Sequence, residues 1–109
     1  MNEEHLRNLL ETGNCPECDL SSIDLTDKDL RDAFLLGADL TNAKLIRCNL
    51  EGANLSGADL QGSDLTGTNL SDADLSGADL SNSNLNGADL TNADLVNANL
   101  NQARMPKGY

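Results

Sequence analysis

Leucine occupies every fifth position of this chain from Leu20 to Leu100, 17 times in succession. A period of five fits neither the 3.6-residue period of an α-helix nor the two-residue period of a flat strand. The leucines must therefore line a shape that turns a corner every five residues. Short repeats of this kind are typical of solenoids, in which each unit completes the core of its neighbours.

The residues around each leucine are restricted as well. Two positions before it, the 17 residues from Cys18 to Ala98 include ten alanines. Two positions after it stand mostly glycine, asparagine and aspartate, which tolerate a positive φ angle and form turns. We expect the leucine and the small residue to point inward. The Asp or Asn just before the leucine, and the Ser or Thr just after it, should face water.

This unit, read as Ala-(Asp/Asn)-Leu-X-X at residues 38–42, 58–62 and 78–82, resembles the consensus of the pentapeptide repeat family. The resemblance covers about residues 15–105, and cyanobacteria are rich in such proteins. It implies an all-β solenoid, a right-handed quadrilateral β-helix of about four coils, with four pentapeptides in each 20-residue coil. On this basis we assign residues 14–105 to the β-helix and expect residues 20 apart to stack.

The two ends of the solenoid differ in sequence. Residues 1–13 predict a short capping α-helix, with Asn2 as its N-cap, Gly13 as its stop and Leu6, Leu9 and Leu10 on one face. Residues 106–109 form a C-terminal tail without a helical pattern. If the tail leaves the last coil uncovered, an end-to-end homodimer is expected, and otherwise a monomer.

Cys15 and Cys18 have the one spacing that suggests chemistry. They occupy inward positions, which predicts buried thiols or a disulfide that staples the first coil. A redox-responsive pair is an alternative, although the pair follows the predicted helix and does not begin one, which is the wrong end for lowering a thiol pKa. A structural metal site would need two further ligands, and only Cys48 and His5 remain, at no recognisable spacing.

Lys28 falls where a small inward residue is expected. A buried unpaired ammonium group is costly, so we expect the side chain to extend outward beside Asp27 or Asp29. The alternative is that Lys28 stays inward beneath Cys48 and lowers the pKa of that thiol.

A partner surface is the remaining candidate site. Phe34 and Leu36 flank the inward Leu35 and should point outward, as should Ile46 and Val96. Stacking at 20 residues would align acidic side chains in two ladders on neighbouring faces. The candidate partner surface comprises Phe34, Leu36, Asp39, Asp59, Asp79, Asp74 and Asp94. The alternative is that these charges serve only to keep the polar faces soluble.

The net charge of −11 argues against direct binding to nucleic acid or to anionic membranes, both of which require basic patches. No apolar run could span a membrane, and no catalytic set, metal site or cofactor fingerprint is present. We therefore expect a non-enzymatic acidic scaffold, without a cofactor, that binds an unknown protein partner.

Two alternatives remain for the function. The resemblance implies a DNA-mimicking, gyrase-binding protein if the chain is dimeric. Cys15 and Cys18 would instead support a redox-responsive or metal-binding protein. The acidic start lacks a secretory signal, which predicts a cytoplasmic protein. A periplasmic or thylakoid-lumen location is expected if a leader was removed.

Overall fold

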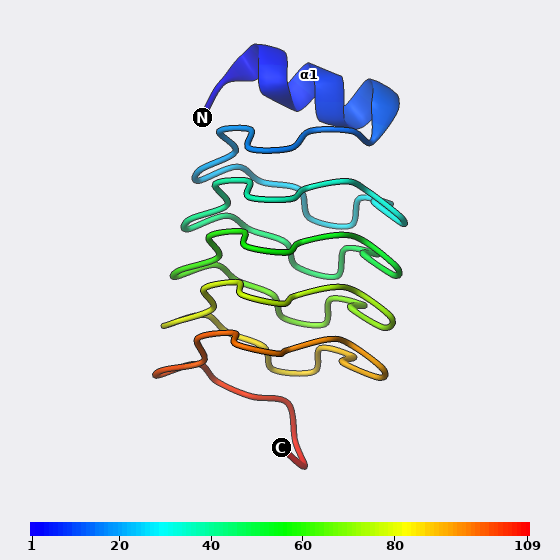
Figure 1. Ribbon diagram of the computed structural model, residues 1–109. Coiled ribbons are helices and arrows are strands. Elements are labelled where there is room, and N and C mark those ends of the chain that lie inside the picture. The colour runs from blue at the N-terminus through cyan, green and yellow to red at the C-terminus, as the bar shows by residue number, and fades with distance from the viewer.

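The computed structural model describes all 109 residues as a stack of similar coils with one helix lying across the N-terminal end (Figure 1). The helix, α1, spans Glu3–Thr12. The coils contain no extended strands. They are joined by single-residue parallel bridges between positions 20 apart, such as Asp19 with Asp39 and Asp39 with Asp59. Each turn of the solenoid therefore holds four pentapeptides, and the molecule measures 38 × 22 × 21 Å.

Backbone hydrogen bonds repeat in every pentapeptide and tie each coil to both neighbours. The Leu40 amide donates to the Asp59 carbonyl of the next coil (2.8 Å), and the Asp59 amide donates back to Ala38 (2.9 Å). Within one coil, the Ala58 amide donates to the Leu55 carbonyl and closes the turn (3.0 Å). The backbone of an inner coil is thereby hydrogen-bonded without long strands, which satisfies the requirement for buried polar groups.

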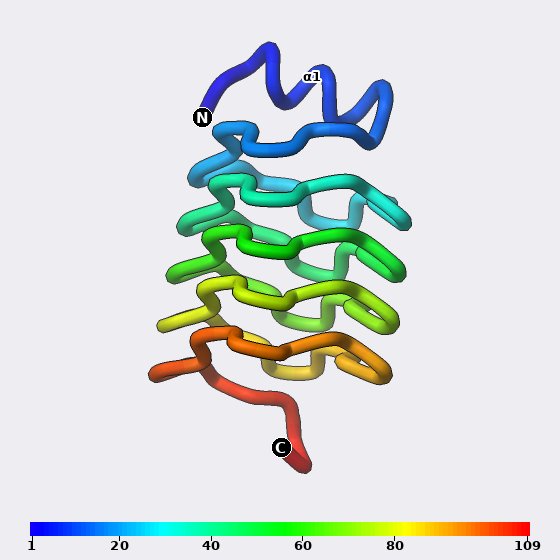
Figure 2. The backbone as a smooth tube through the Cα atoms, in the orientation of Figure 1, coloured from blue at the N-terminus to red at the C-terminus, as the bar shows by residue number.

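The core is formed by the inward leucines and the small residues between them. Every repeat leucine from Leu20 to Leu90 is buried, and most are completely inaccessible to solvent. The smooth trace in Figure 2 shows how closely the successive coils superimpose, so that each leucine lies over the leucine 20 residues away. The interior is narrow, and alanine at the small position leaves space for leucines from all four sides.

At one corner of the solenoid, asparagine and glycine alternate from coil to coil, as Asn42, Gly62 and Asn82. Gly62 has a φ angle of +68°, in the left-handed region that favours glycine. A Cβ atom at Gly62 would collide with the Oδ1 atom of Asn42, which occupies the same corner one coil earlier. The Asn42 side chain therefore occupies space that a side chain at position 62 would need, and it would have to move if Gly62 were replaced.

Two hydroxyl groups lie in one inward column, at Ser63 and Ser83. The Ser63 hydroxyl donates to the Leu60 carbonyl at 2.7 Å. The Ser83 hydroxyl is equally buried but has no hydrogen-bond partner. The two hydroxyls do not bond to each other, and burial of the unpaired Ser83 hydroxyl costs stability.

Replacement of Ser83 by alanine should therefore stabilise the protein, by roughly 1 kcal/mol, because it removes an unsatisfied buried hydroxyl. Urea unfolding followed by circular dichroism measures the change. Ser63→Ala is the matched control, because it removes a hydroxyl that is bonded, and it should be neutral or destabilising. Equal effects from both replacements would contradict this interpretation.

The helix α1 begins and ends at the residues that the sequence indicates. The Asn2 side chain accepts hydrogen bonds from the Glu4 and His5 amides, and Gly13 ends the helix with a φ of 70°. Leu9 is fully buried against the core and Leu6 is partly buried. The prediction that Leu10 lies on the same face is wrong, because Leu10 is 50% exposed. The buried face of α1 is only one or two residues wide.

The C-terminal end of the solenoid is open. Inward residues of the last coil, including Leu95 and Leu100, are only partly buried. The backbone amides of Leu90, Leu95 and Leu100 have no acceptor, whereas the equivalent Leu70, Leu75 and Leu80 amides each donate to the following coil. The tail beyond Met105 runs below this end (Figure 2), and Pro106 is the only residue of the tail that is buried. The two ends therefore differ, one being covered by α1 and the other bare.

Candidate interaction surface

The Asp or Asn before each leucine holds the turn that follows it. The Asp39 Oδ1 atom accepts a hydrogen bond from the Thr41 amide at 3.0 Å, and the Asn54 Oδ1 atom accepts one from the Ser56 amide at 3.0 Å. These are side chain-to-backbone bonds two residues along the chain. Because asparagine makes the same bond, the turn needs an oxygen at this position and not a negative charge.

Several of these carboxylates are stabilised in their charged form. The Ser76 hydroxyl and amide lower the pKa of Asp74, and the Thr91 hydroxyl and amide lower the pKa of Asp89. A lowered pKa in the folded state contributes stability above the ordinary aspartate range, and this contribution is lost as the pH falls through the lowered value. These aspartates therefore remain charged at neutral and mildly acidic pH.

The fold separates charges that are mixed along the sequence. One side of the solenoid, called here the acidic half, carries seven acidic residues and no Lys, Arg or His. Its acids are Glu17, Asp19, Asp39, Asp59, Asp74, Asp79 and Asp94. The acidic half comprises residues 14–22, 34–42, 54–62, 74–82 and 94–102, which the 20-residue bridges stack on one another.

The opposite side carries eight acidic residues but also, up to Arg104, five basic ones. It includes Arg47, which forms an ion pair with Asp27 at 2.9 Å, and Arg31, which forms one with Asp29 at 2.9 Å. Lys44 and Arg104 lie on this side as well. The basic side chains of the coils therefore all lie on this side, and the one positive charge near the acidic half is the amino terminus, 3.5 Å from Asp19.

Stacked aspartates on the acidic half repel one another. Asp19, Asp39, Asp59 and Asp79 follow in one column of parallel bridges, which places neighbouring backbones about 4.8 Å apart. Like charges directly opposite one another destabilise a sheet. Asn99 continues the column with the same turn bond to the Asn101 amide, so the uncharged residue was structurally sufficient.

Exposed apolar side chains lie on the same half. Phe34 is 39% exposed, Leu36 is 38% exposed and Val96 is 63% exposed. Phe34 stacks on Asn54 in the column that continues to Asp74 and Asp94. The structure therefore places every candidate partner residue named from the sequence on the acidic half, around one corner of the solenoid. Ile46, expected outward, is half-buried on the opposite side.

Cys15 and Cys18 form a disulfide in the first coil, next to α1. Both residues are buried. The Cys15 Sγ atom lies 3.2 Å from the His5 carbonyl of α1, and because the disulfide has no thiol hydrogen this is a packing contact. The disulfide thus links two residues of the first coil at the point where α1 packs against this coil.

Lys28 is exposed, as expected from the cost of burying its charge. It lies in the first coil, where no preceding coil closes the inward position. The Lys28 ammonium group forms no ion pair with Asp27 or Asp29. These two aspartates pair with Arg47 and Arg31 instead. The alternative, that Lys28 stays inward and lowers the pKa of Cys48, is wrong. Burial raises the pKa of this thiol to about 11, and its Sγ donates to the Leu25 carbonyl at 2.7 Å.

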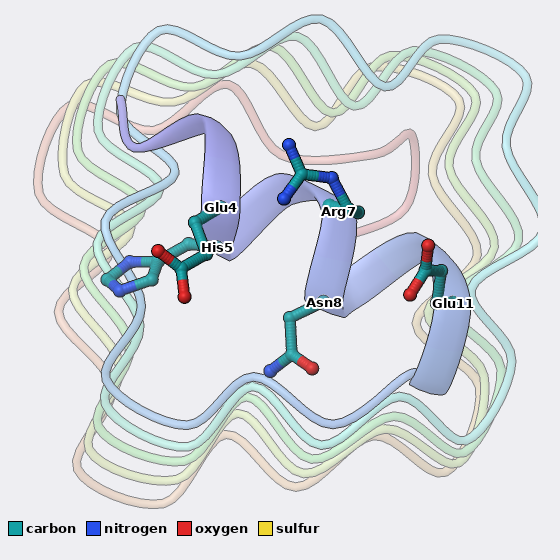
Figure 3. Close-up of a pocket in the computed structure, with 5 residues that line it drawn as sticks. All are labelled: Glu4, His5, Arg7, Asn8 and Glu11. Atoms are coloured by element: carbon teal, nitrogen blue, oxygen red, sulfur yellow. The ribbon is translucent and has the colours of Figure 1, made fainter.

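The one pocket lies beside α1 and is open and polar. Its volume is about 350 Å³, and it is lined by Glu4, His5, Arg7, Asn8 and Glu11. Figure 3 shows these side chains spread around a helix that crosses the mouth of the solenoid, with His5 reaching over the rim of the first coil. No group of three or more potential metal ligands is present anywhere in the molecule. No helix has the length and apolar character needed to cross a membrane.

The repeat, the 20-residue bridges and the leucine-filled interior define the molecule as a solenoid of four-sided coils. The chain belongs to the pentapeptide repeat family, whose model matches eight copies over residues 18–57, 35–72 and 68–106. The family implies a right-handed quadrilateral β-helix. Pentapeptide repeat proteins are generally non-enzymatic structural or interaction proteins. No curated protein matches the chain significantly.

Solved structures of pentapeptide repeat proteins resemble the chain. Rfr23 from the cyanobacterium Cyanothece 51142 is 27% identical over 96% of this chain and 95% of its own, with a TM-score of 0.45. HetL from Nostoc sp. strain PCC 7120, involved in heterocyst differentiation regulation, is 39% identical, with a TM-score of 0.46. The match covers 88% of this chain, which spans 50% of HetL. A protein from the Arabidopsis thaliana thylakoid lumen is 29% identical over 86% of this chain and 66% of its own, with a TM-score of 0.45.

One contact at the capped end has no signal in the sequence. The Nδ1 atom of His5 accepts a hydrogen bond from the Asp19 amide at 2.8 Å. Sequence analysis considered His5 only as a metal ligand, because nothing in the helical pattern indicates which coil amide a helix residue will meet.

Proposed function

We propose that the protein is a non-enzymatic interaction scaffold that binds a basic segment of another protein on its acidic half. The observation that carries this proposal is the placement of charge, with seven acidic residues and no basic side chain on the half that also exposes Phe34, Leu36 and Val96. A partner with lysines or arginines around apolar side chains would complement both properties.

The stacked aspartates support binding over a purely structural role. Asparagine makes the same turn bond at several equivalent positions, so each aspartate adds only a charge on its second oxygen. Aligning these charges costs stability. Acidic residues lie on both sides of the solenoid, whereas the basic side chains of the coils all lie on the opposite side, so the acidic half keeps nearly all of its negative charge.

The test measures binding of a synthetic helical peptide of lysine and leucine by isothermal titration calorimetry. A peptide of the same charge, with glutamine in place of leucine, tests the apolar contribution. The triple replacement Asp39→Asn, Asp59→Asn and Asp79→Asn keeps every turn bond and removes three charges. It should weaken binding at least tenfold while leaving the fold unchanged or more stable.

A charge-matched control is available on the opposite half. Asp24, Asp64 and Asp89 each hold a turn amide in the same way, and their replacement by asparagine changes the net charge equally. This control should leave binding within about twofold. Equal weakening by both triple variants would show that only the net charge matters and would refute a specific face.

The apolar residues are tested separately. Phe34→Ser, Leu36→Ser and Val96→Ser together should remove the preference for the leucine peptide over the glutamine peptide. Since all three side chains are substantially exposed, the fold should tolerate the changes. A preference that survives in this variant would place the apolar contact elsewhere.

A second candidate role follows from the bare C-terminal end. The unpaired amides of Leu90, Leu95 and Leu100 and the partly exposed core favour a second copy docked end to end. Because α1 covers the other end, only a closed C-end to C-end dimer can form. Such a dimer would double the acidic rod and is the form in which a DNA-mimicking, gyrase-binding role would be tested. Light scattering at two concentrations distinguishes a mass near 23 kDa from the monomer's 11.5 kDa.

The Cys15–Cys18 disulfide supports an oxidising compartment such as the periplasm or the thylakoid lumen. Because both cysteines are buried, a structural staple is favoured over rapid redox exchange.

Replacement of both Cys15 and Cys18 by alanine should lower the free energy of unfolding by roughly 2 kcal/mol, the loop-closure contribution for so short a loop. Urea unfolding with and without a reducing agent measures the loss. Reduction of the native protein should reproduce it, and the double variant should not respond to the reducing agent. Unchanged stability of the reduced protein would show that the disulfide is not a staple.

A further inference from the structure

The helix α1 is held to the first coil by few contacts. Leu9 is its only fully buried residue. Two polar contacts meet at the Asp19 backbone: its carbonyl accepts from the Asn2 amide at 3.0 Å, and its amide donates to the Nδ1 atom of His5 at 2.8 Å. Asn8 adds a bond to the Asn14 carbonyl at 2.9 Å, and the amino terminus contacts Ser21 and the Asp19 carboxylate. With so few contacts, loss of the His5 bond should weaken the docking of the helix measurably.

The bond between His5 and Asp19 exists in only one protonation state. The Nδ1 atom must carry a lone pair to accept the amide hydrogen, so the imidazole is neutral with its proton on Nε2. A protonated imidazole has hydrogens on both nitrogens and would direct one of them at the Asp19 amide. Protonation thus replaces an attraction with a contact between two donors.

We propose that His5 is a proton-sensitive latch, which holds α1 over the first coil when neutral and releases it when protonated. The sign follows from the geometry. The closed cap requires the neutral imidazole, so the cap should be less stable at a pH where the imidazole is protonated than at one where it is neutral.

The charged groups around the imidazole come from three segments. The first coil provides the Asp19 carboxylate, which accepts from the Ser21 amide and hydroxyl. The amino terminus lies 3.5 Å from that carboxylate, and Glu4 of α1 lines the same groove as His5 (Figure 3). Carboxylates and amino groups ordinarily keep their charge between pH 7 and 5, whereas histidine ordinarily changes it. His5 is the only histidine in the chain, so one proton is expected to control the cap.

The test is amide hydrogen exchange by nuclear magnetic resonance at pH 7 and pH 5, corrected for intrinsic exchange rates. The amides of Asp19 and Gly13 report on the cap, because Asp19 binds His5 and Gly13 closes the helix on Leu9. Their protection should fall about fivefold or more at pH 5, the equivalent of one hydrogen bond. The Leu60 amide in the central coils should not change.

Two variants separate the latch from other effects of acid. His5→Asn places an amide oxygen near the position of Nδ1 and cannot be protonated in this range, so its cap should be equally protected at both pH values. His5→Leu has no acceptor, so its cap should be weakly protected at both. The proposal is overturned if wild-type protection does not change, or if either variant retains the wild-type pH dependence.

Discussion

Replacement of Leu60 by alanine should lower the free energy of unfolding by about 3–4 kcal/mol. Leu60 is fully inaccessible and lies between Leu40 and Leu80, which are also fully buried. Removing the side chain leaves a cavity that the neighbouring coils cannot close, because every coil is fixed to the next by backbone hydrogen bonds. Urea unfolding followed by circular dichroism measures the loss.

Leu95→Ala is the matched control for this prediction. Leu95 occupies the same repeat position in the last coil but is only partly buried. Its replacement should cost about 1 kcal/mol, since less apolar surface returns to water. If both replacements cost the same in the monomer, the C-terminal end is not open, and the end-to-end contact loses its basis.

Replacement of Ala58 by lysine should prevent folding or cost more than about 4 kcal/mol. Ala58 is buried between Ala38 and Ala78, so the ammonium group would have neither a partner nor a path to water. Thermal unfolding monitored by circular dichroism provides the measurement, and loss of the cooperative transition is the expected result.

Lys28 gives the comparison from within the chain. It stands at the same repeat position but is exposed at the end of the solenoid. Lys28→Ala should therefore change the free energy of unfolding by about 0.5 kcal/mol or less. A tolerated lysine at position 58 would mean that the central coils can open locally, which the continuous hydrogen bonding of that region argues against.

The fold follows most directly from the sequence where the repeat is regular. The leucine at every fifth position and the alanine two residues before it were both predicted to point inward, and both are buried in the coils. The start and end of α1 were also predicted, since Asn2 and Gly13 act locally on the helix backbone.

Predictions failed where the outcome depends on a contact between distant segments. Leu10 was assigned to the buried face of α1, but the width of that face is set by the coil beneath it. The thiol of Cys48 was considered as a neighbour of an ammonium group, yet the lysine extends away from the core. The bond between His5 and Asp19 joins residues 14 apart and has no local pattern.

The sequence alone determined the period, the inward residues, the turn positions and the helix ends. Each of these follows from local chemistry repeated many times, so that single irregular residues do not obscure it. The tertiary structure alone decided that the basic side chains of the coils lie opposite the stacked acids, and which residues fix α1. Both depend on contacts between distant residues: the 20-residue stacking brings Asp39, Asp59 and Asp79 into one column, while Lys44 and Arg47, which stand between the first two in the sequence, lie on the opposite side.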